Sequence, residues 1–351
     1  MTKNFIFFKN NSKFKLNNFK LLFFITMIFS TMISINSNSW INAWMGMEIN
    51  LMSFIPLMMS SNKKKSSNST MIYFIVQAMA SSLILLSTLL MKIEINLVKL
   101  NMMYSLIQFS LLMKLGAAPL HWWTPKIFMN LNWKIGFNFL TWQKIAPIML
   151  LNTSINNNLM IYMMMISSIL TGAILGMNQT MIKLIMIYSS INHMGWMLMA
   201  LMMNMSLMIM YFIIYSMMNL MICLLMNNMN IDYLNQLFKN NNQNLFFKIL
   251  TLSMFLSLGG MPPFLGFMPK LAILITMMNN NLMMESMLFI SMAMLTLSFY
   301  MNPMLAMFLS TKFSTKWSLK NDYIKKNFIM MFLINLTLSM VILPFIIKFM
   351  L

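Results

Sequence analysis

The sequence predicts an all-α polytopic membrane protein with about eleven transmembrane helices, arranged as two inverted five-helix repeats that each hold one broken helix. Of its 351 residues, 60% are hydrophobic and only 8% are charged, whereas a soluble domain has roughly 25% charged residues. Apolar runs recur from residue 21 to the end, and no polar stretch between them could form a soluble domain. We therefore predict a basic N-terminal extension, 1–20, followed by one transmembrane domain, 21–351.

The basic head carries five lysines and no acidic residue, namely Lys3, Lys9, Lys13, Lys15 and Lys20. A basic head before an apolar run also begins signal and transit peptides. The run at 21–37 leads almost directly into a second run and has no small-residue cleavage pattern. This favours its retention as the first spanning helix.

The later apolar runs each meet the length of roughly 17–25 residues that a bilayer core requires. They lie at about 40–60, 71–91, 101–119, 135–152, 159–177, 180–203, 206–227, 246–278 (broken), 283–309 and 327–350.

The distribution of lysines tests this set of spans, because lysines gather in the loops on one side of a membrane. When the loops alternate sides, the lysine-rich segments (1–20, 61–70, 120–134, 228–248 and 310–326) all fall on the same side. The opposite side holds only Lys92, Lys99 and Lys348, with Glu94 and Glu285. We therefore place the N-terminus inside and the C-terminus outside.

Two spans are interrupted by similar sequences, GAAP at Gly116–Pro119 and GGMPP at Gly259–Pro263. Proline removes a backbone donor, and glycine lets the chain reorient. Non-helical backbone at membrane depth is tolerated only inside protein or along a wet cavity, and paired interruptions point to a transport site. The breaks are 143 residues apart, roughly five spans. Because five is an odd number of spans, the second copy would be inverted in the membrane relative to the first. Coincidence is the alternative, because proline and glycine are common in membrane helices.

Five charged residues are left over when the loops are assigned to the two sides, and they lie within the predicted spans: Glu48, Lys114, Lys144, Lys183 and Lys270. A lysine at the centre of a spanning helix costs about 2.5–3.5 kcal/mol on insertion scales. Lys144 is eight or nine residues from both ends of its span, too far for its ammonium to reach the interface, so we assign it a function. Lys183 is about one turn from the basic side, and we expect it to extend to that surface, with a functional role as the alternative.

His193 is one of only two histidines. Its titration range suits a proton relay, but a hydrogen-bonded packing histidine fits equally well. No histidine pair has metal-ligand spacing, no glycine-rich loop could bind a nucleotide, and the single cysteine, Cys223, cannot hold an iron–sulfur cluster. We predict no cofactor or metal on this chain, and we attribute its excess of lysine to orientation in the membrane rather than to a nucleic-acid partner.

Five motifs together resemble the subunit 2 family of mitochondrial NADH:ubiquinone oxidoreductase, respiratory complex I. They are WMGMEIN at Trp44–Asn50, KLGAAPLHWW at Lys114–Trp123, TWQKIAP at Thr141–Pro147, SSINHMGW at Ser189–Trp196 and LGGMPPFLGFMPK at Leu258–Lys270. They run in the family's order and cover about 20–350. The basic head departs from the pattern.

The resemblance implies a proton-pumping, antiporter-like subunit of complex I, with 21–351 as its antiporter-like transmembrane domain. The NADH, flavin, iron–sulfur clusters and ubiquinone are then bound by other subunits. Its partners are then the other membrane subunits and membrane lipids. By similarity, Glu48 pairs with Lys114, Lys144 is the central lysine, Lys270 belongs to the second broken helix, and His193 lies on the axis between them. Two rival functions stay open: an autonomous sodium/proton antiporter of the same fold, and a structural membrane subunit whose buried charges only pair.

The resemblance also implies the mitochondrial inner membrane, with the N-terminus in the matrix and the C-terminus in the intermembrane space. The composition agrees with an organelle gene, because the chain has 53 methionines and no arginine, with abundant asparagine, isoleucine, phenylalanine and lysine. These are the residues that an AT-rich gene favours. We therefore expect the protein to be mitochondrially encoded.

Overall fold

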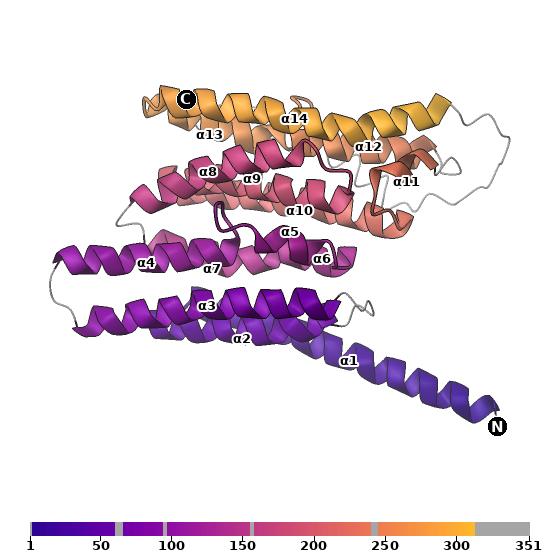
Figure 1. The fold of residues 1–351 in the computed structure, drawn as a ribbon, viewed down its shortest axis with the longest axis horizontal. Helices are drawn as coiled ribbons and strands as arrows, with labels where there is room; N and C mark the ends of the chain where they lie inside the picture. The colour runs from indigo at the N-terminus through magenta and orange to yellow at the C-terminus, as the bar shows by residue number, and fades with distance from the viewer. Residues whose placement is uncertain (1, 60–65, 94–96, 155–157, 240–244, 313–351) are drawn as a thin grey trace. The chain divides into compact units, whose positions relative to one another are not determined.

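The computed structural model describes residues 2–59, 66–93, 97–154, 158–239 and 245–312, and every named element in these ranges is an α-helix. The prediction of an all-α protein is confirmed. The helices, labelled in Figure 1, are α1 Thr2–Ile35, α2 Trp40–Met59, α3 Ser66–Ile93, α4 Leu97–Leu115, α5 Trp123–Phe128, α6 Trp133–Leu140, α7 Trp142–Thr153, α8 Asn158–Gly176, α9 Ile182–Met203, α10 Met205–Met229, α11 Leu234–Lys239, α12 Leu245–Gly259, α13 Phe267–Asn279 and α14 Met283–Lys312.

Five helices in the described ranges are long and apolar enough to cross a membrane. They are Ser67–Ile93, Leu159–Gly176, Ile182–Met203, Met205–Met229 and Met283–Leu305. Shorter apolar helices lie at Phe19–Ile35, Ile249–Gly259 and Phe267–Asn279. The count of eleven spans stays a prediction, because the last predicted span, 327–350, lies outside the described residues.

Both predicted helix breaks are present. Helix α4 ends at Leu115, directly before the first glycine–proline sequence, and α12 ends at Gly259, inside the second. Gly116 has φ +70° and Gly260 has φ +84°. Both angles lie in the left-handed region, which glycine adopts without the steric cost that a Cβ brings.

The predicted span 135–152 is a third interrupted segment, and this interruption was not predicted from the sequence. It forms α6 and α7, with a turn at Thr141 between them. The Thr141 hydroxyl donates to the Phe137 carbonyl at 2.8 Å. A threonine that bonds to the carbonyl four residues earlier in this way often bends a helix. The interruption lies three residues before Lys144.

The predicted basic head is part of a helix, because α1 runs without a break from Thr2 through residue 20 to Ile35. The boundary between an extension and the transmembrane domain therefore stays a prediction.

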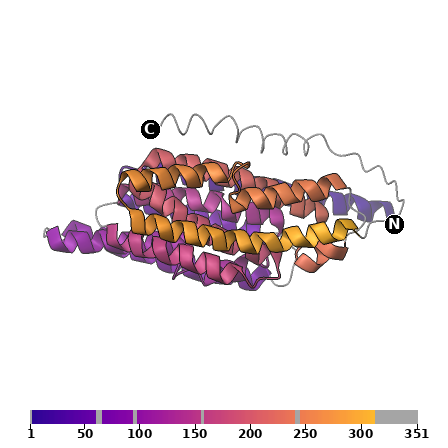
Figure 2. The ribbon, with the colours of Figure 1, turned by 90° about the horizontal axis from the view of Figure 1, so that it is seen from above.

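The described helices divide into two compact units. The first contains α1–α4 and α7, and the second contains α5 and α9–α14, while α6 and α8 cross the boundary. In the first unit, α2 packs against α1 and α3, α3 packs against α4, and α7 packs against α1 and α4. In the second unit, α9 contacts α5, α10, α13 and α14. Figure 2 shows α12 and α13 following one another along α14.

Polar side chains inside these helices mostly bond to their own backbone. The hydroxyls of Ser30 and Ser34 in α1 each donate at 2.8 Å to the carbonyl three residues earlier. Because such a hydroxyl brings no unsatisfied donor into hydrocarbon, it lets serine pack at a helix contact. A Cβ on Gly46 of α2 would lie 2.8 Å from the backbone nitrogen of Ser34, so α1 and α2 approach closely at small residues.

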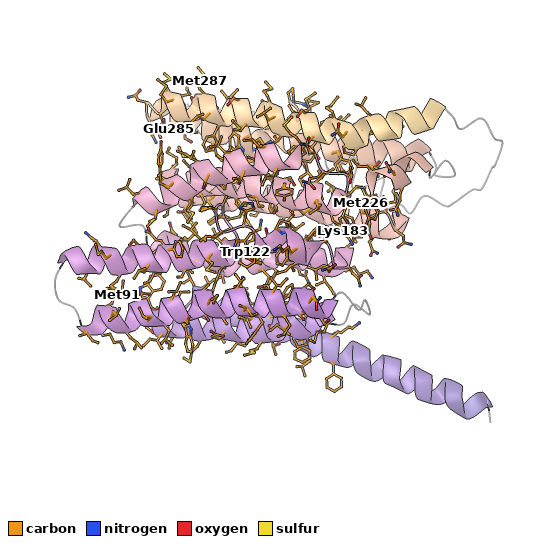
Figure 3. The ribbon with its side chains drawn as sticks, viewed as in Figure 1. Met91, Trp122, Lys183, Met226, Glu285 and Met287 are labelled. Carbon is orange, nitrogen blue, oxygen red and sulfur yellow. The ribbon has the colours of Figure 1, made fainter. Side chains whose placement is uncertain are left out.

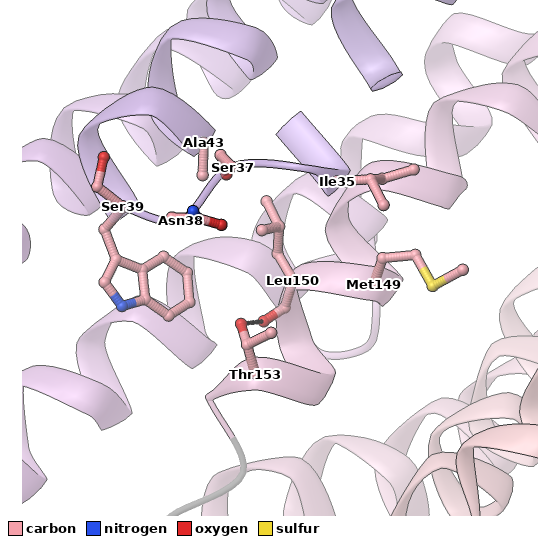
Figure 4. A pocket seen from close by; sticks show the side chains of 9 residues that line it. Ile35, Ser37, Asn38, Ser39, Ala43, Met149, Leu150 and Thr153 are labelled. Carbon is pink, nitrogen blue, oxygen red and sulfur yellow. Dashed lines mark hydrogen bonds between the residues drawn. The ribbon is translucent and has the colours of Figure 1, made fainter. Parts of the chain in front are cut away.

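A hollow of about 180 Å³ lies between the α1–α2 turn and the C-terminal half of α7 (Figure 4). Its polar lining includes Ser37, Asn38, Ser39 and Thr153, and the Thr153 hydroxyl donates to the Leu150 carbonyl at 2.8 Å. None of the five predicted site residues lines this hollow. It therefore says nothing about access to them.

Candidate functional site

Lys114 occupies the last turn of α4, next to the first helix break, and its side chain is buried. Its Nζ lies 3.6 Å from the Sδ of Met47 in α2. Glu48 is the next residue of α2. Lys114 therefore contacts the residue that precedes its predicted partner, and the pairing of Glu48 with Lys114 stays a prediction.

Gly116 sets the path of the chain directly after this lysine. Besides its positive φ, a Cβ at Gly116 would lie 2.4 Å from Cγ2 of Thr124, far inside van der Waals contact. Only glycine fits both the dihedral angle and the available space.

Lys144 is buried in the first turn of α7. The same helix contains Pro147, which has no N–H to offer the Gln143 carbonyl. An interruption before the lysine and a proline after it thus weaken the helical hydrogen bonding around the charge. Glu48, Lys114 and Lys144 all belong to the first unit.

Lys270 of α13 is buried in the second unit, and its Nζ donates to the Gly259 carbonyl at 2.9 Å. The last carbonyls of a helix lack intrahelical partners, and a cation there also complements the helix dipole. The ammonium lies 5.9 Å from the centroid of the Trp196 ring as well. A Cβ on Gly260 would approach Nζ to 3.0 Å. At the second helix break, the C-terminal end of α12 therefore binds the ammonium of Lys270.

His193 is buried on α9, where nearly every side chain is buried. Its Nδ1 lies 2.7 Å from the Tyr211 hydroxyl, and its ring centroid lies 5.2 Å from that of Tyr215. Both tyrosines come from one face of α10, four residues apart. This geometry fits the packing role and the relay role equally, because a hydrogen-bonded histidine–tyrosine pair can stabilise a core or pass a proton.

Lys183 is buried, and its ammonium pairs with an acid of the segment 228–248, which the loop alternation assigns to the basic side. Its Nζ lies 2.9 Å from Oδ1 of Asp232, with the two side chains 3% and 33% exposed. Backbone pairing draws Asp232 to this position, since Ile182 N donates to the Asp232 carbonyl and Leu234 N donates to the Thr180 carbonyl, each at 3.0 Å. This partner was not predicted from the sequence, although Asp232 is one of only five acids.

A second acid is paired at the far end of the same unit. The Tyr162 hydroxyl donates to Glu285 Oε1 at 2.7 Å. Figure 3 shows Lys183 and Glu285 at opposite ends of the helices of this unit. The placement of 228–248 and Glu285 on different sides of the membrane stays a prediction.

The described residues hold no group of three His, Cys, Asp or Glu side chains that could bind a metal ion. The lysine, glutamate and histidine side chains of the candidate site are groups that can bind and release protons. The described residues place Glu48, Lys114 and Lys144 in one unit, and His193 and Lys270 in the other.

Comparisons with known proteins point to one family. Residues 37–296 match the family described as "NADH:quinone oxidoreductase/Mrp antiporter, TM". The NADH-ubiquinone oxidoreductase chain 2 of Anopheles gambiae is 40% identical over 309 residues, which cover 87% of this chain and 90% of that protein. The chain 2 of Aedes aegypti is 38% identical over 318 residues, covering 90% and 93%.

Two solved structures share the fold at low sequence identity. A chain of respiratory complex I from Thermus thermophilus gives a TM-score of 0.76 at 18% identity, covering 82% of this chain and 70% of that chain. A chain of the membrane-bound sulfane sulfur reductase, an archaeal respiratory membrane complex, gives 0.81 at 15% identity, covering 92% and 73%.

Proposed function

The chain belongs to the NADH-ubiquinone oxidoreductase chain 2 family, and on that premise we propose that it moves protons across the membrane as a subunit of respiratory complex I. The observation that carries this function is a set of three lysines, Lys114, Lys144 and Lys270, buried inside helical membrane segments next to interruptions of the helix. A buried ammonium is costly in hydrocarbon, and intramembrane ionisable groups mark proton and ion pathways.

We assign the relay to Glu48, Lys114, Lys144, Lys270 and His193. Redox-driven changes elsewhere in the complex would alter the charge near Glu48 and Lys114, and each lysine would respond by binding or releasing a proton. NADH, flavin, iron–sulfur clusters and ubiquinone belong to other subunits in this proposal.

The finer architecture is also part of the proposal. It has about eleven spanning helices in two inverted five-helix repeats, with the breaks at Gly116 and Gly260 in equivalent positions. The positive φ of both glycines and the buried lysine beside each break support this equivalence. The protein would lie in the mitochondrial inner membrane among other membrane subunits and lipids, encoded by the organelle.

Copurification distinguishes the proposed function from that of an autonomous sodium/proton antiporter. We expect the chain to copurify at fixed stoichiometry with flavin- and iron–sulfur-bearing subunits, as judged by a native gel of solubilised membranes with mass spectrometry. Sodium/proton exchange by the isolated chain in vesicles, with no such partners, would instead favour an autonomous antiporter.

The proposed orientation predicts how lysines react with a membrane-impermeant amine reagent. Lys63, Lys64 and Lys65, which lie outside the described residues, should react only from the matrix side, because lysine-rich loops stay on that side. Lys92 is exposed at the end of α3 and serves as the control, since it should react only from the intermembrane side. Modification of Lys63–Lys65 in intact mitoplasts would overturn the orientation.

Glu48 and Lys114 should show coupled effects in a double-mutant cycle. Glu48→Gln leaves the Lys114 ammonium without its nearby negative charge, so it should impair assembly or activity more alone than together with Lys114→Met. Interaction energies in such networks are about 0.5–3 kcal/mol. Complex content and quinone reductase activity measure the cycle. Strictly additive effects of the two substitutions would show that Glu48 and Lys114 do not interact.

A further inference from the structure

Gln143, the residue before Lys144, joins three helices of the first unit through its side chain. Its Oε1 accepts from Asn50 Nδ2 of α2 and from the Tyr73 hydroxyl of α3, each at 3.2 Å. Its Nε2 donates to Asn50 Oδ1 at 3.2 Å and approaches the Met27 Sδ of α1 at 3.5 Å. The Asn50 and Gln143 amides therefore face each other as a reciprocal pair.

These contacts use the whole hydrogen-bonding capacity of the Gln143 amide. A primary amide has two lone pairs on oxygen and two N–H groups on nitrogen. Two donors reach Oε1, and Nε2 faces one oxygen and one sulfur. The side chain therefore has nothing left with which to accept or pass a proton, and its role is to hold α7 in place.

The same face of α3 reaches the other lysine of this unit. Gln77 lies one turn beyond Tyr73, and both are buried. Gln77 Nε2 donates to the Lys114 carbonyl at 3.3 Å, at the point where α4 ends. One face of α3 thus contacts the residue before Lys144 and the backbone of Lys114.

We propose that Asn50, Tyr73, Gln77 and Gln143, which we name the amide frame, are positioning residues that fix Lys144 and Lys114 relative to each other. The inference rests on the proposed pumping role of Lys144. The interaction between two charges depends on their separation and on the local dielectric. A shift of about 1 Å in a positioned group can have a large effect on function. Without the frame, α7 could rotate or slide while remaining folded, and the two lysines would lose their coupling.

The frame belongs to α2 as much as to α7. Asn50 lies two residues after Glu48 on the same helix, so the amide pair also links the helix that carries Glu48 to the helix that carries Lys144. Loss of the pair should therefore disturb charge transfer between Glu48, Lys114 and Lys144 without removing any group that titrates.

The test uses the assembled complex in sealed vesicles and measures the proton-to-electron ratio beside the complex content on a native gel. Gln143→Met keeps the length of the side chain and removes the amide pair. We expect the assembled variant to lose most of the pumping that Lys144→Met loses. The matched control is Gln108→Met, because Gln108 is also a buried amide, on α4, and donates to the Ser154 carbonyl. It should keep the normal ratio in whatever complex assembles.

A rescue variant separates positioning from general stability. Gln143→Asn shortens one partner by a methylene and should lower the ratio, and adding Asn50→Gln restores a reciprocal pair of the same total length. We expect the exchanged pair to recover the ratio. This comparison also decides the matter if Gln143→Met fails to assemble.

The outcomes distinguish the inference from the function on which it rests. A normal proton-to-electron ratio for Lys144→Met would contradict the proposed relay. A low ratio for Lys144→Met together with a normal ratio for Gln143→Met and Gln143→Asn would contradict only the positioning role of the amide frame. An equally low ratio for Gln108→Met, or no recovery in the exchanged pair, would show that the amides only stabilise the fold.

Discussion

Lys144→Met should leave complex I assembled and strongly lower its proton pumping, because folding and transport make opposite demands on this side chain. For folding, methionine removes the cost of an ammonium within hydrocarbon, about 2.5–3.5 kcal/mol at a helix centre, and is similar in volume. We therefore expect a neutral or mildly favourable effect on complex content.

For transport, Lys144 is the only titratable side chain in α7, Trp142–Thr153. A chain of water molecules alone supplies no site whose charge responds to neighbouring charges. Quinone reductase activity should also fall if chemistry and pumping are tightly coupled.

The measurement is the proton-to-electron ratio in sealed vesicles, normalised to the complex content on a native gel. Lys134→Met is the matched control, since Lys134 lies on α6 with an exposed side chain and should keep both quantities. Normal content with a normal ratio for Lys144→Met would exclude the relay role and favour a purely structural subunit. Loss of content would show that the lysine is needed to build the complex.

The sequence was sufficient for the features that depend on local chemistry. Gly116 and Gly260 are predicted as break points because glycine and proline change the backbone wherever they occur, and α4 and α12 end there. Lys144 is predicted to be buried because it is far from both ends of an apolar run, and its side chain is 6% exposed. Neither prediction needs knowledge of neighbouring helices.

The partners of the buried lysines could not be predicted in this way, because helix packing decides them. Lys114 contacts the sulfur of Met47, and Lys270 contacts the carbonyl of Gly259. A thioether and a backbone carbonyl carry no net charge, so searching the sequence for acids would miss both. The Lys183–Asp232 pair was missed for a related reason, since it depends on a backbone contact 50 residues apart.

The amide frame shows the same limit. Gln143 and Asn50 stand inside two of the motifs that identify the family, yet nothing in either motif indicates that the two amides meet. Their pairing follows from the rotation of α2 and α7 about their axes, which only the packed structure gives.

Gly266→Ala should prevent the second helix break from forming and strongly reduce the amount of assembled complex. Gly266 has an ordinary helical φ of −67°, so its requirement for glycine is one of space. A Cβ there would lie 1.8 Å from the Ser257 carbonyl oxygen near the end of α12. That oxygen also accepts a hydrogen bond from Gly260 N at 3.1 Å. The clash falls on backbone and not on a side chain that could rotate away, so we expect a cost at or above the usual range of about 1–3 kcal/mol for overpacking.

Gly259→Ala provides the matched control within the same motif. A Cβ on Gly259 would meet Cδ2 of Leu297 at 3.0 Å, and the end of a leucine side chain can move by a few tenths of an ångström at small cost. The Lys270 hydrogen bond to the Gly259 carbonyl does not involve the added methyl group. We therefore expect near-normal complex content for Gly259→Ala and a severe loss for Gly266→Ala. The content is measured on native gels of membranes from cells grown in parallel. Equal content for the two variants would contradict the close approach of Gly266 to the α12 backbone that holds Lys270 in place.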